Sequence, residues 1–113
     1  MVVASALLGA VFLASGATGS DGAQAAKSIK VTVGDNFYSP SAITISKGTR
    51  AKFNWTGGNR HNVRLKKGPG KKFRSKTTRS NGVNYKRKFK KRGTYKLFCS
   101  IHSDEMNLTL KVI

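Results

Sequence analysis

The sequence predicts an all-β domain, a Greek-key β-sandwich or barrel of seven to eight short strands. Segments in which polar and apolar side chains alternate recur along the chain, most clearly over residues 106–113. Turn-forming glycine, proline and asparagine residues separate these segments. After residue 26, no segment shows the period of an amphipathic helix. Alternation, frequent turns and the lack of a helical period together favour sheet over any helical class.

The elements follow from this alternation in chain order. Strands are expected at 28–33, 42–46, 50–55, 61–65, 83–89, 94–99 and 106–113. Phe37 and Tyr38, between the first two strands, are expected to fill the core as an aromatic plug. The residues expected to point inward in the middle strands are Ala51, Phe53 and Trp55, then His61, Val63 and Leu65, then Val83, Tyr85 and Phe89, with Arg87 breaking the last alternation.

A leader is expected at 1–25, followed by one domain at 26–113. All 22 lysine and arginine residues lie after residue 26. The apolar run from Val2 to Ala14 is shorter than the roughly 20 residues that span a bilayer, and Ala23-x-Ala25 matches the signal-peptidase pattern. Cleavage after Ala25, or after Ala26, predicts export to the periplasm or the extracellular space with no transmembrane segment retained. An uncleaved anchor is the alternative.

Soft metal ligands gather in one short stretch of the sequence. Cys99 is the only cysteine, and His102 and Met106 follow it within eight residues. The second histidine, His61, lies in another predicted strand. Two imidazoles, a thiolate and a weak thioether are the ligand set of electron-transfer copper sites, whereas methionine is a poor zinc ligand. His61, Cys99, His102 and Met106 are therefore predicted to bind one copper ion.

Simpler interpretations exist for each of these residues. A lone cysteine in a strand is usually a small buried apolar side chain, and a lone histidine is usually structural. The combination changes this assessment, because Cys99 is expected to point into the core at a sheet end while His102 and Met106 occupy the loop that follows. A free thiol in an oxidising compartment is also a hazard unless it is buried or ligated.

The mature chain resembles the cupredoxins, the small blue copper proteins, and in particular the amicyanin, pseudoazurin and plastocyanin group. The resemblance covers residues 28–113 and rests on these motifs: Phe37-x-x-Pro40, Ile43-Thr44-Ile45 with Gly48, Phe53-x-Trp55, His61-Asn62-Val63, Gly68-Pro69 with Phe73-Arg74-Ser75, and Gly93-Thr94-Tyr95-x-x-x-Cys99-x-x-His102. It implies a cupredoxin-like sandwich and one type 1 copper that shuttles single electrons without substrate turnover.

The resemblance also assigns roles to individual residues. It implies ligation by His61 Nδ1, Cys99 Sγ and His102 Nδ1, with Met106 Sδ as the axial ligand. It further implies that Asn62 ties the first-histidine segment to the cysteine loop through Ser100, a contact that orients the ligands.

The ligand loop departs from the family pattern in two ways. Three residues separate His102 from Met106, where the family commonly has two or four. Ser103-Asp104-Glu105 replaces the Pro-Gly that often follows this histidine. Asp104 and Glu105 are interpreted as solvated loop residues. Two alternatives stay open: that the two carboxylates favour Cu(II), and that Glu105 supplies an axial oxygen ligand.

The charge is strongly positive, at +18. Residues 64–92 hold 14 of the 22 basic side chains. We expect this segment to contact an acidic redox protein or an anionic envelope surface, since charge steers fast, transient encounters. A merely solvated face is the simpler alternative, and high charge opposes self-association, so a monomer is expected. Nucleic acid is disfavoured by the expected export and by the lack of an RNA-binding motif.

Three functions are compatible with these residues. The first is an exported one-electron copper carrier. The second is a copper storage or delivery module without redox shuttling, and the third is a cationic sandwich with a vestigial site. Catalysis is not expected, because the sequence shows no Ser-His-Asp set, carboxylate pair or phosphate loop. Four protein ligands would also leave no coordination position for a substrate.

Overall fold

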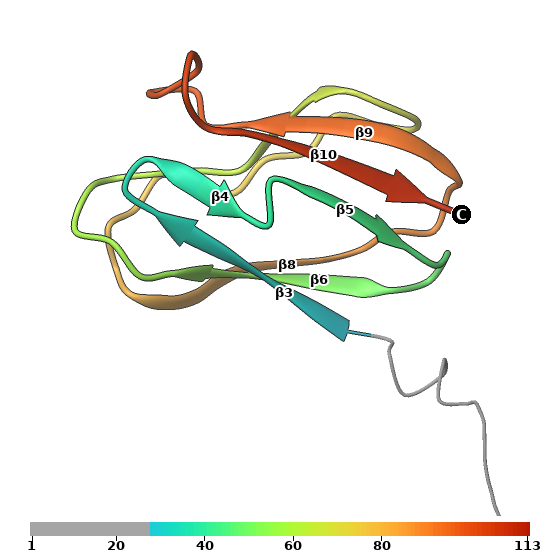
Figure 1. Cartoon of the computed structure of the whole chain (residues 1–113), viewed down its shortest axis with the longest axis horizontal. Coiled ribbons are helices and arrows are strands. Elements are labelled where there is room, and N and C mark those ends of the chain that lie inside the picture. Colours follow the sequence, from blue (N-terminus) through green and yellow to red (C-terminus); the bar gives the residue numbers. More distant parts are fainter. Residues whose placement is uncertain (1–27) are drawn as a thin grey trace, which may run out of the picture.

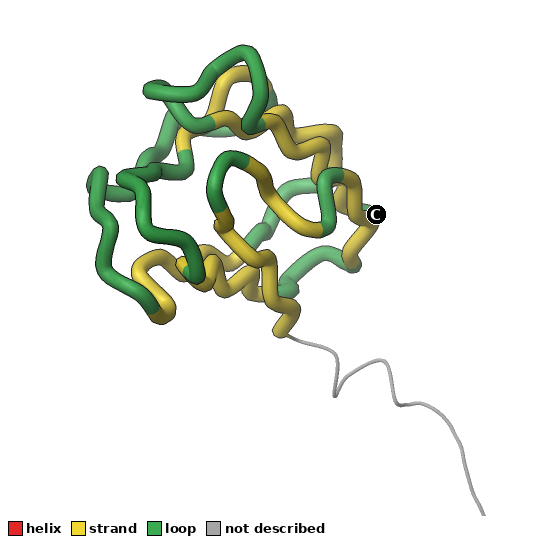
Figure 2. The backbone as a smooth tube through the Cα atoms, turned by 60° about the vertical axis from the view of Figure 1, so that its left-hand side comes forward, coloured by secondary structure: helices red, strands yellow, loops and turns green. Residues whose placement is uncertain are grey.

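The computed structural model describes residues 28–113, and the predicted leader lies outside this range. Its eight strands are β3 (Ser28–Gly34), β4 (Phe37–Ser39), β5 (Ala42–Ile45), β6 (Arg50–Trp55), β7 (Arg64–Lys67), β8 (Gly82–Lys88), β9 (Gly93–Phe98) and β10 (Asn107–Val112). Strands and loops make up the whole of the described chain (Figure 2). No helix among these residues is long and apolar enough to cross a membrane. The predicted all-β class is confirmed.

Two mixed four-stranded sheets form the sandwich (Figure 1). One sheet has the order β5-β10-β9-β7 and the other β4-β3-β6-β8. The β10–β5 and β3–β6 pairs are parallel, and the remaining pairs are antiparallel. Strands adjacent in the sheets are therefore often distant in sequence, which brings segments from both halves of the chain to the same end of the sandwich.

The core lies between the sheets, where alternation turns every second side chain inward. β6 contributes Ala51, Phe53 and Trp55, as predicted, and all three are buried. The other buried apolar residues are Val31, Val33, Tyr38, Ile45, Val63, Leu65, Phe89, Tyr95, Leu97, Cys99, Met106, Leu108, Leu110 and Val112. The two predicted soft ligands Cys99 and Met106 thus belong to the main core.

The predicted strand 61–65 is wrong in its bounds. β7 begins only at Arg64, and His61 makes just an isolated bridge to Thr78. His61, Asn62 and Val63 are all buried in succession, unlike a half-buried strand, in which successive side chains point to opposite faces and alternate in burial. This irregular stretch turns both the His61 ring and the Asn62 amide inward.

Three further expectations were wrong in part. Val83 is 44% exposed, because the β6–β8 register shifts between Phe53 and Asn54, and such a bulge reverses the facing of the residues beyond it. Phe37 is also exposed, at 47%, so Tyr38 alone fills the core from β4. Cys99 lies one residue beyond β9 and not within it, although it is buried as expected.

Candidate metal centre

Three loops meet at one end of the sandwich, on the left of Figure 1. They are the turn between β3 and β4, the segment 56–63 that follows β6, and the loop 99–106 that joins β9 to β10. Hydrogen bonds link the second of these loops to both of the others. All four predicted metal ligands lie in two of the three loops.

His61 is fully buried and is held by its ring and by its backbone. Its Nε2 lies 2.7 Å from Asp35 Oδ1, and its backbone exchanges two hydrogen bonds with Thr78, at 2.9 and 3.0 Å. An ionised carboxylate can only accept a hydrogen bond. The proton of this bond is therefore on Nε2, which donates the hydrogen bond to Asp35. Nδ1 is then the ring atom that can offer a lone pair to a metal, and it is buried with no hydrogen-bond partner among residues 28–113.

Asp35 was not predicted as a site residue. Hydrogen bonds from His61 and from the backbone N–H groups of Gly58 and Asn59 hold the pKa of this carboxyl down to about 2. The carboxylate is therefore ionised near neutral pH and lies against His61. The only signal in the sequence was scarcity, since Asp35 is one of three acidic residues that follow the leader.

Backbone hydrogen bonds close the loop that carries the other three predicted ligands. The Cys99 N–H donates to the Met106 carbonyl at 3.2 Å, and the His102 N–H donates to the Cys99 carbonyl at 3.1 Å. The Met106 N–H in turn donates to the His102 carbonyl at 2.9 Å. Cys99 and Met106 are buried, whereas His102 is half-buried.

The structure brings the two imidazoles together. The ring centroids of His61 and His102 lie 5.1 Å apart, with an angle of 52° between the ring planes. Within residues 28–113, however, no three side chains of His, Cys, Asp or Glu are arranged closely enough to form a metal-binding group. The four-ligand set therefore stays a prediction, with its two imidazoles adjacent and its two sulfur side chains on the loop beside them.

Asn62 connects the His61 segment to the cysteine loop. Its Nδ2 donates to Ser100 Oγ at 2.9 Å, and its Oδ1 accepts from the Ser100 N–H at 2.9 Å. A further bond runs from Nδ2 to Thr77 Oγ1 at 2.9 Å. Because Ser100 follows Cys99 directly, these contacts fix the spacing between the two ligand segments.

Two core aromatic residues donate hydrogen bonds to backbone carbonyl groups at this end of the sandwich. Tyr38 donates its hydroxyl to the Asn62 carbonyl at 2.6 Å, and Trp55 donates Nε1–H to the Thr78 carbonyl at 3.0 Å. Burial, with a smaller contribution from Cys99, raises the pKa of Tyr38 well above its usual range, so the phenol keeps the proton it donates. The irregular stretch 61–63 is thus anchored on both sides.

The acidic residues of the ligand loop point to solvent. Asp104 and Glu105 are exposed, while the neighbouring Met106 is completely buried. Ile101, in the same loop, is 49% exposed. Exposure of Glu105 and burial of Met106 favour the thioether over the carboxylate as the side chain that reaches a buried metal.

The chain from residue 25 to residue 113 matches the family model for copper binding proteins of the plastocyanin/azurin family. The chain belongs to this family. It is a cupredoxin, a copper protein of the electron-transfer type, and copper is its cofactor, with one ion per chain. The buried Nδ1 of His61 and the buried sulfur atoms of Cys99 and Met106 suit that ion chemically.

Solved structures share the fold of this cupredoxin. A purple cupredoxin from Nitrosopumilus maritimus is 23% identical, with a TM-score of 0.64, over 74% of this chain and 98% of the other. An oxidised amicyanin variant is 19% identical, with a TM-score of 0.67, over 76% and 82% of the two chains. No curated protein matches the chain.

A copper-containing nitrite reductase from Thermus scotoductus SA-01 also shares the fold. It is 23% identical, with a TM-score of 0.64 over 75% of this cupredoxin. This chain spans only 22% of that reductase. The likeness is therefore confined to one portion of the larger enzyme.

Proposed function

We propose that this cupredoxin carries single electrons through one type 1 copper bound by His61 Nδ1, Cys99 Sγ, His102 Nδ1 and, axially, Met106 Sδ. The observation that carries the proposal is the buried Nδ1 of His61, which has no partner among residues 28–113 while Nε2 is held by Asp35. A buried polar atom without a partner costs free energy. A metal ion at Nδ1 removes that cost.

The other three ligands follow from the loop geometry. Cys99 and Met106 are buried and held by backbone hydrogen bonds. The ring centroid of His102 lies 5.1 Å from that of His61. Since His102 is the half-buried member, its ring has the most freedom to complete the set. When bound, copper supplies a Cu(II)/Cu(I) couple that gains or loses one electron. Buried, hydrogen-bonded ligands resist rearrangement when that charge changes.

Copper titration tests the site directly. Adding Cu(II) to the purified protein is expected to produce an intense visible band from thiolate-to-copper charge transfer, saturating at one equivalent. Cys99→Ser removes the thiolate and is expected to abolish the band. Ser103→Ala, an exposed position in the same loop, serves as the matched control and retains it. A colourless wild type, or a band that survives in Cys99→Ser, would refute the ligand set.

Voltammetry separates the two copper functions. A one-electron carrier gives a reversible wave, whereas a storage or delivery module shows the band without one.

We infer further that the protein is not an enzyme, because four protein ligands leave no position for a substrate. A nitrite assay of the copper-loaded protein tests this inference, and turnover would contradict it.

We also propose that the protein is exported to the periplasm or the extracellular space after removal of residues 1–25. The family match beginning at residue 25 supports this boundary. The intact mass of the mature chain tests it, with Ala26 expected as the first residue.

For the partner, we propose an acidic redox protein that docks on basic side chains of the segment 64–92. Arg64 and Arg74 lie directly opposite each other in an isolated bridge, an arrangement of like charges that destabilises a sheet. Among residues 28–113, the one carboxylate contact at ion-pair distance is that of Asp35 with His61, so neither arginine has a carboxylate partner there. An external anion would relieve the repulsion.

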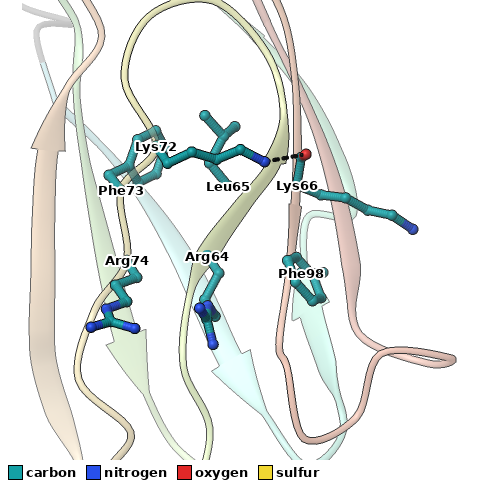
Figure 3. Close-up of a pocket in the computed structure, with 7 residues that line it drawn as sticks. All are labelled: Arg64, Leu65, Lys66, Lys72, Phe73, Arg74 and Phe98. Atoms are coloured by element: carbon teal, nitrogen blue, oxygen red, sulfur yellow. Dashed lines mark hydrogen bonds between the residues drawn. The ribbon is translucent and has the colours of Figure 1, made fainter.

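This arginine pair lines a pocket that Phe98, the last residue of β9, also lines (Figure 3). Arg64 and Arg74 point to the same side in this view, and Phe98 lies beside Arg64, on the side away from Arg74. Arg64 pairs with Phe98 in the sheet, and Cys99 is the next residue. A partner held by the two guanidinium groups would therefore sit close to the proposed copper ligand.

Electron exchange with a small anion tests the role of the pair. Arg64→Gln with Arg74→Gln is expected to slow oxidation of the reduced protein by hexacyanoferrate(III) about tenfold at low salt, because local positive charge steers anions. High salt should remove the difference. Arg50→Gln with Lys52→Gln, on β6 of the other sheet, makes the same change in net charge as a control. Equal slowing in both double variants would show that net charge alone matters.

A further inference from the structure

The carboxylate of Asp35 is held in a fixed position behind His61. Its Oδ2 accepts the Gly58 N–H at 2.8 Å, and its Oδ1 accepts the Asn59 N–H at 3.0 Å. The same Oδ1 lies 2.7 Å from His61 Nε2. One side chain from the β3–β4 turn thus binds three positions of the loop that leads into the first proposed ligand.

Glycine at position 57 makes room for this carboxylate. A Cβ atom added to Gly57 would lie 2.2 Å from Asp35 Oδ1, a distance that real Cβ atoms do not show. A Cβ added to Gly58 would approach Asp35 no closer than 3.9 Å. Neither glycine has a positive φ, so the two positions differ in the space beside the carboxylate and not in backbone strain.

We propose that Asp35 is a positioning residue for the copper centre, a role that rests on the proposed function. Its acceptor oxygen selects the His61 tautomer that carries the proton on Nε2 and leaves Nδ1 free for the metal. Its negative charge, one imidazole away from the ion, stabilises Cu(II) more than Cu(I). A tether that merely closed the 56–60 loop would have neither effect.

Metal-free protein provides the first test. Nitrogen-15 NMR of His61 in the wild-type apoprotein is expected to show a single tautomer, with the proton on Nε2. Asp35→Ala removes the acceptor and is expected to give a mixture of tautomers. Gly57→Ala should reproduce that mixture by displacing the carboxylate, and Gly58→Ala should leave the wild-type spectrum unchanged.

Copper affinity provides the second test. Asp35→Asn retains an acceptor oxygen but removes the charge, so it is expected to weaken Cu(II) binding relative to Cu(I) binding about tenfold. That ratio corresponds to a rise of about 59 mV in the reduction potential of a one-electron couple. Ser28→Lys, at the exposed first residue of β3, makes the same change in net charge as a control.

The outcomes separate this inference from the proposed function. An unchanged tautomer in both Asp35→Ala and Gly57→Ala would overturn the positioning role, even if the Cys99-dependent band persisted. An Asp35→Asn shift no larger than that of Ser28→Lys would overturn the charge role. Loss of the band in the wild type would refute the copper ligand set, while the apoprotein spectra would still report on the tautomer.

Discussion

Phe53→Ala is expected to lower the free energy of unfolding by about 3–5 kcal/mol. Phe53 is completely buried at the centre of β6, between β3 and β8, and its ring packs 5.8 Å from that of Tyr85. Truncation loses the burial of the ring and leaves a cavity that a close-packed sandwich cannot fully close. The total free energy of unfolding of a domain of this size is only about 5–15 kcal/mol.

Urea unfolding followed by the fluorescence of Trp55, the only tryptophan, measures this loss. Val83→Ala, on the neighbouring β8, removes an apolar side chain that the bulge turns outward and is the matched control. Its expected cost is below about 0.5 kcal/mol. Similar unfolding midpoints for the two variants would mean that Phe53 does not occupy the packed centre.

Asn62→Ala is expected to cost about 2–4 kcal/mol and to loosen the proposed ligand loop. The substitution leaves the Ser100 N–H, the Ser100 hydroxyl and the Thr77 hydroxyl without the partner they now share. Asn62 is buried and Ser100 is half-buried, whereas Thr77 is exposed, so the two Ser100 groups bear most of the loss. The ligand segments of His61 and Cys99 would then lose the side-chain hydrogen bonds that link them.

Two measurements follow this loss in the metal-free protein. Urea unfolding gives the free energy, and hydrogen exchange at the Ser100 amide is expected to accelerate well beyond the effect of global destabilisation. Asn107→Ala is the control, since Asn107 donates to the Ser103 carbonyl at the surface near the same loop. If Asn62→Ala cost no more than Asn107→Ala, the amide would not be what couples the two segments.

The sequence predicted those parts of the fold that depend on local alternation. Strands 28–33, 50–55 and 94–99 each lie within about one residue of β3, β6 and β9, because one face of each strand is buried and the pattern shows it. The prediction that Val83 points inward was wrong, because the face on which this side chain lies depends on a register shift opposite Asn54. A bulge arises from how two strands pair, which neither strand shows alone.

The residues of the candidate site also differ in whether the sequence alone could predict them. Cys99, His102 and Met106 could be proposed together because they share one loop, and their residue types name the metal. Asp35 could not, because it reaches His61 through a turn 26 residues earlier. That contact depends on the shape of the 56–60 loop and on the small size of Gly57, so it emerges only in three dimensions.

The positions of the cationic residues also bear on how copies of this protein meet one another. A sheet can grow by pairing its outer strand with that of another molecule. Here three outer strands, β4, β5 and β7, have only three or four residues each. The fourth, β8, is longer, but it is bulged and carries Lys86, Arg87 and Lys88. Every outer strand is thus short or charged, which protects the sandwich against edge-to-edge aggregation.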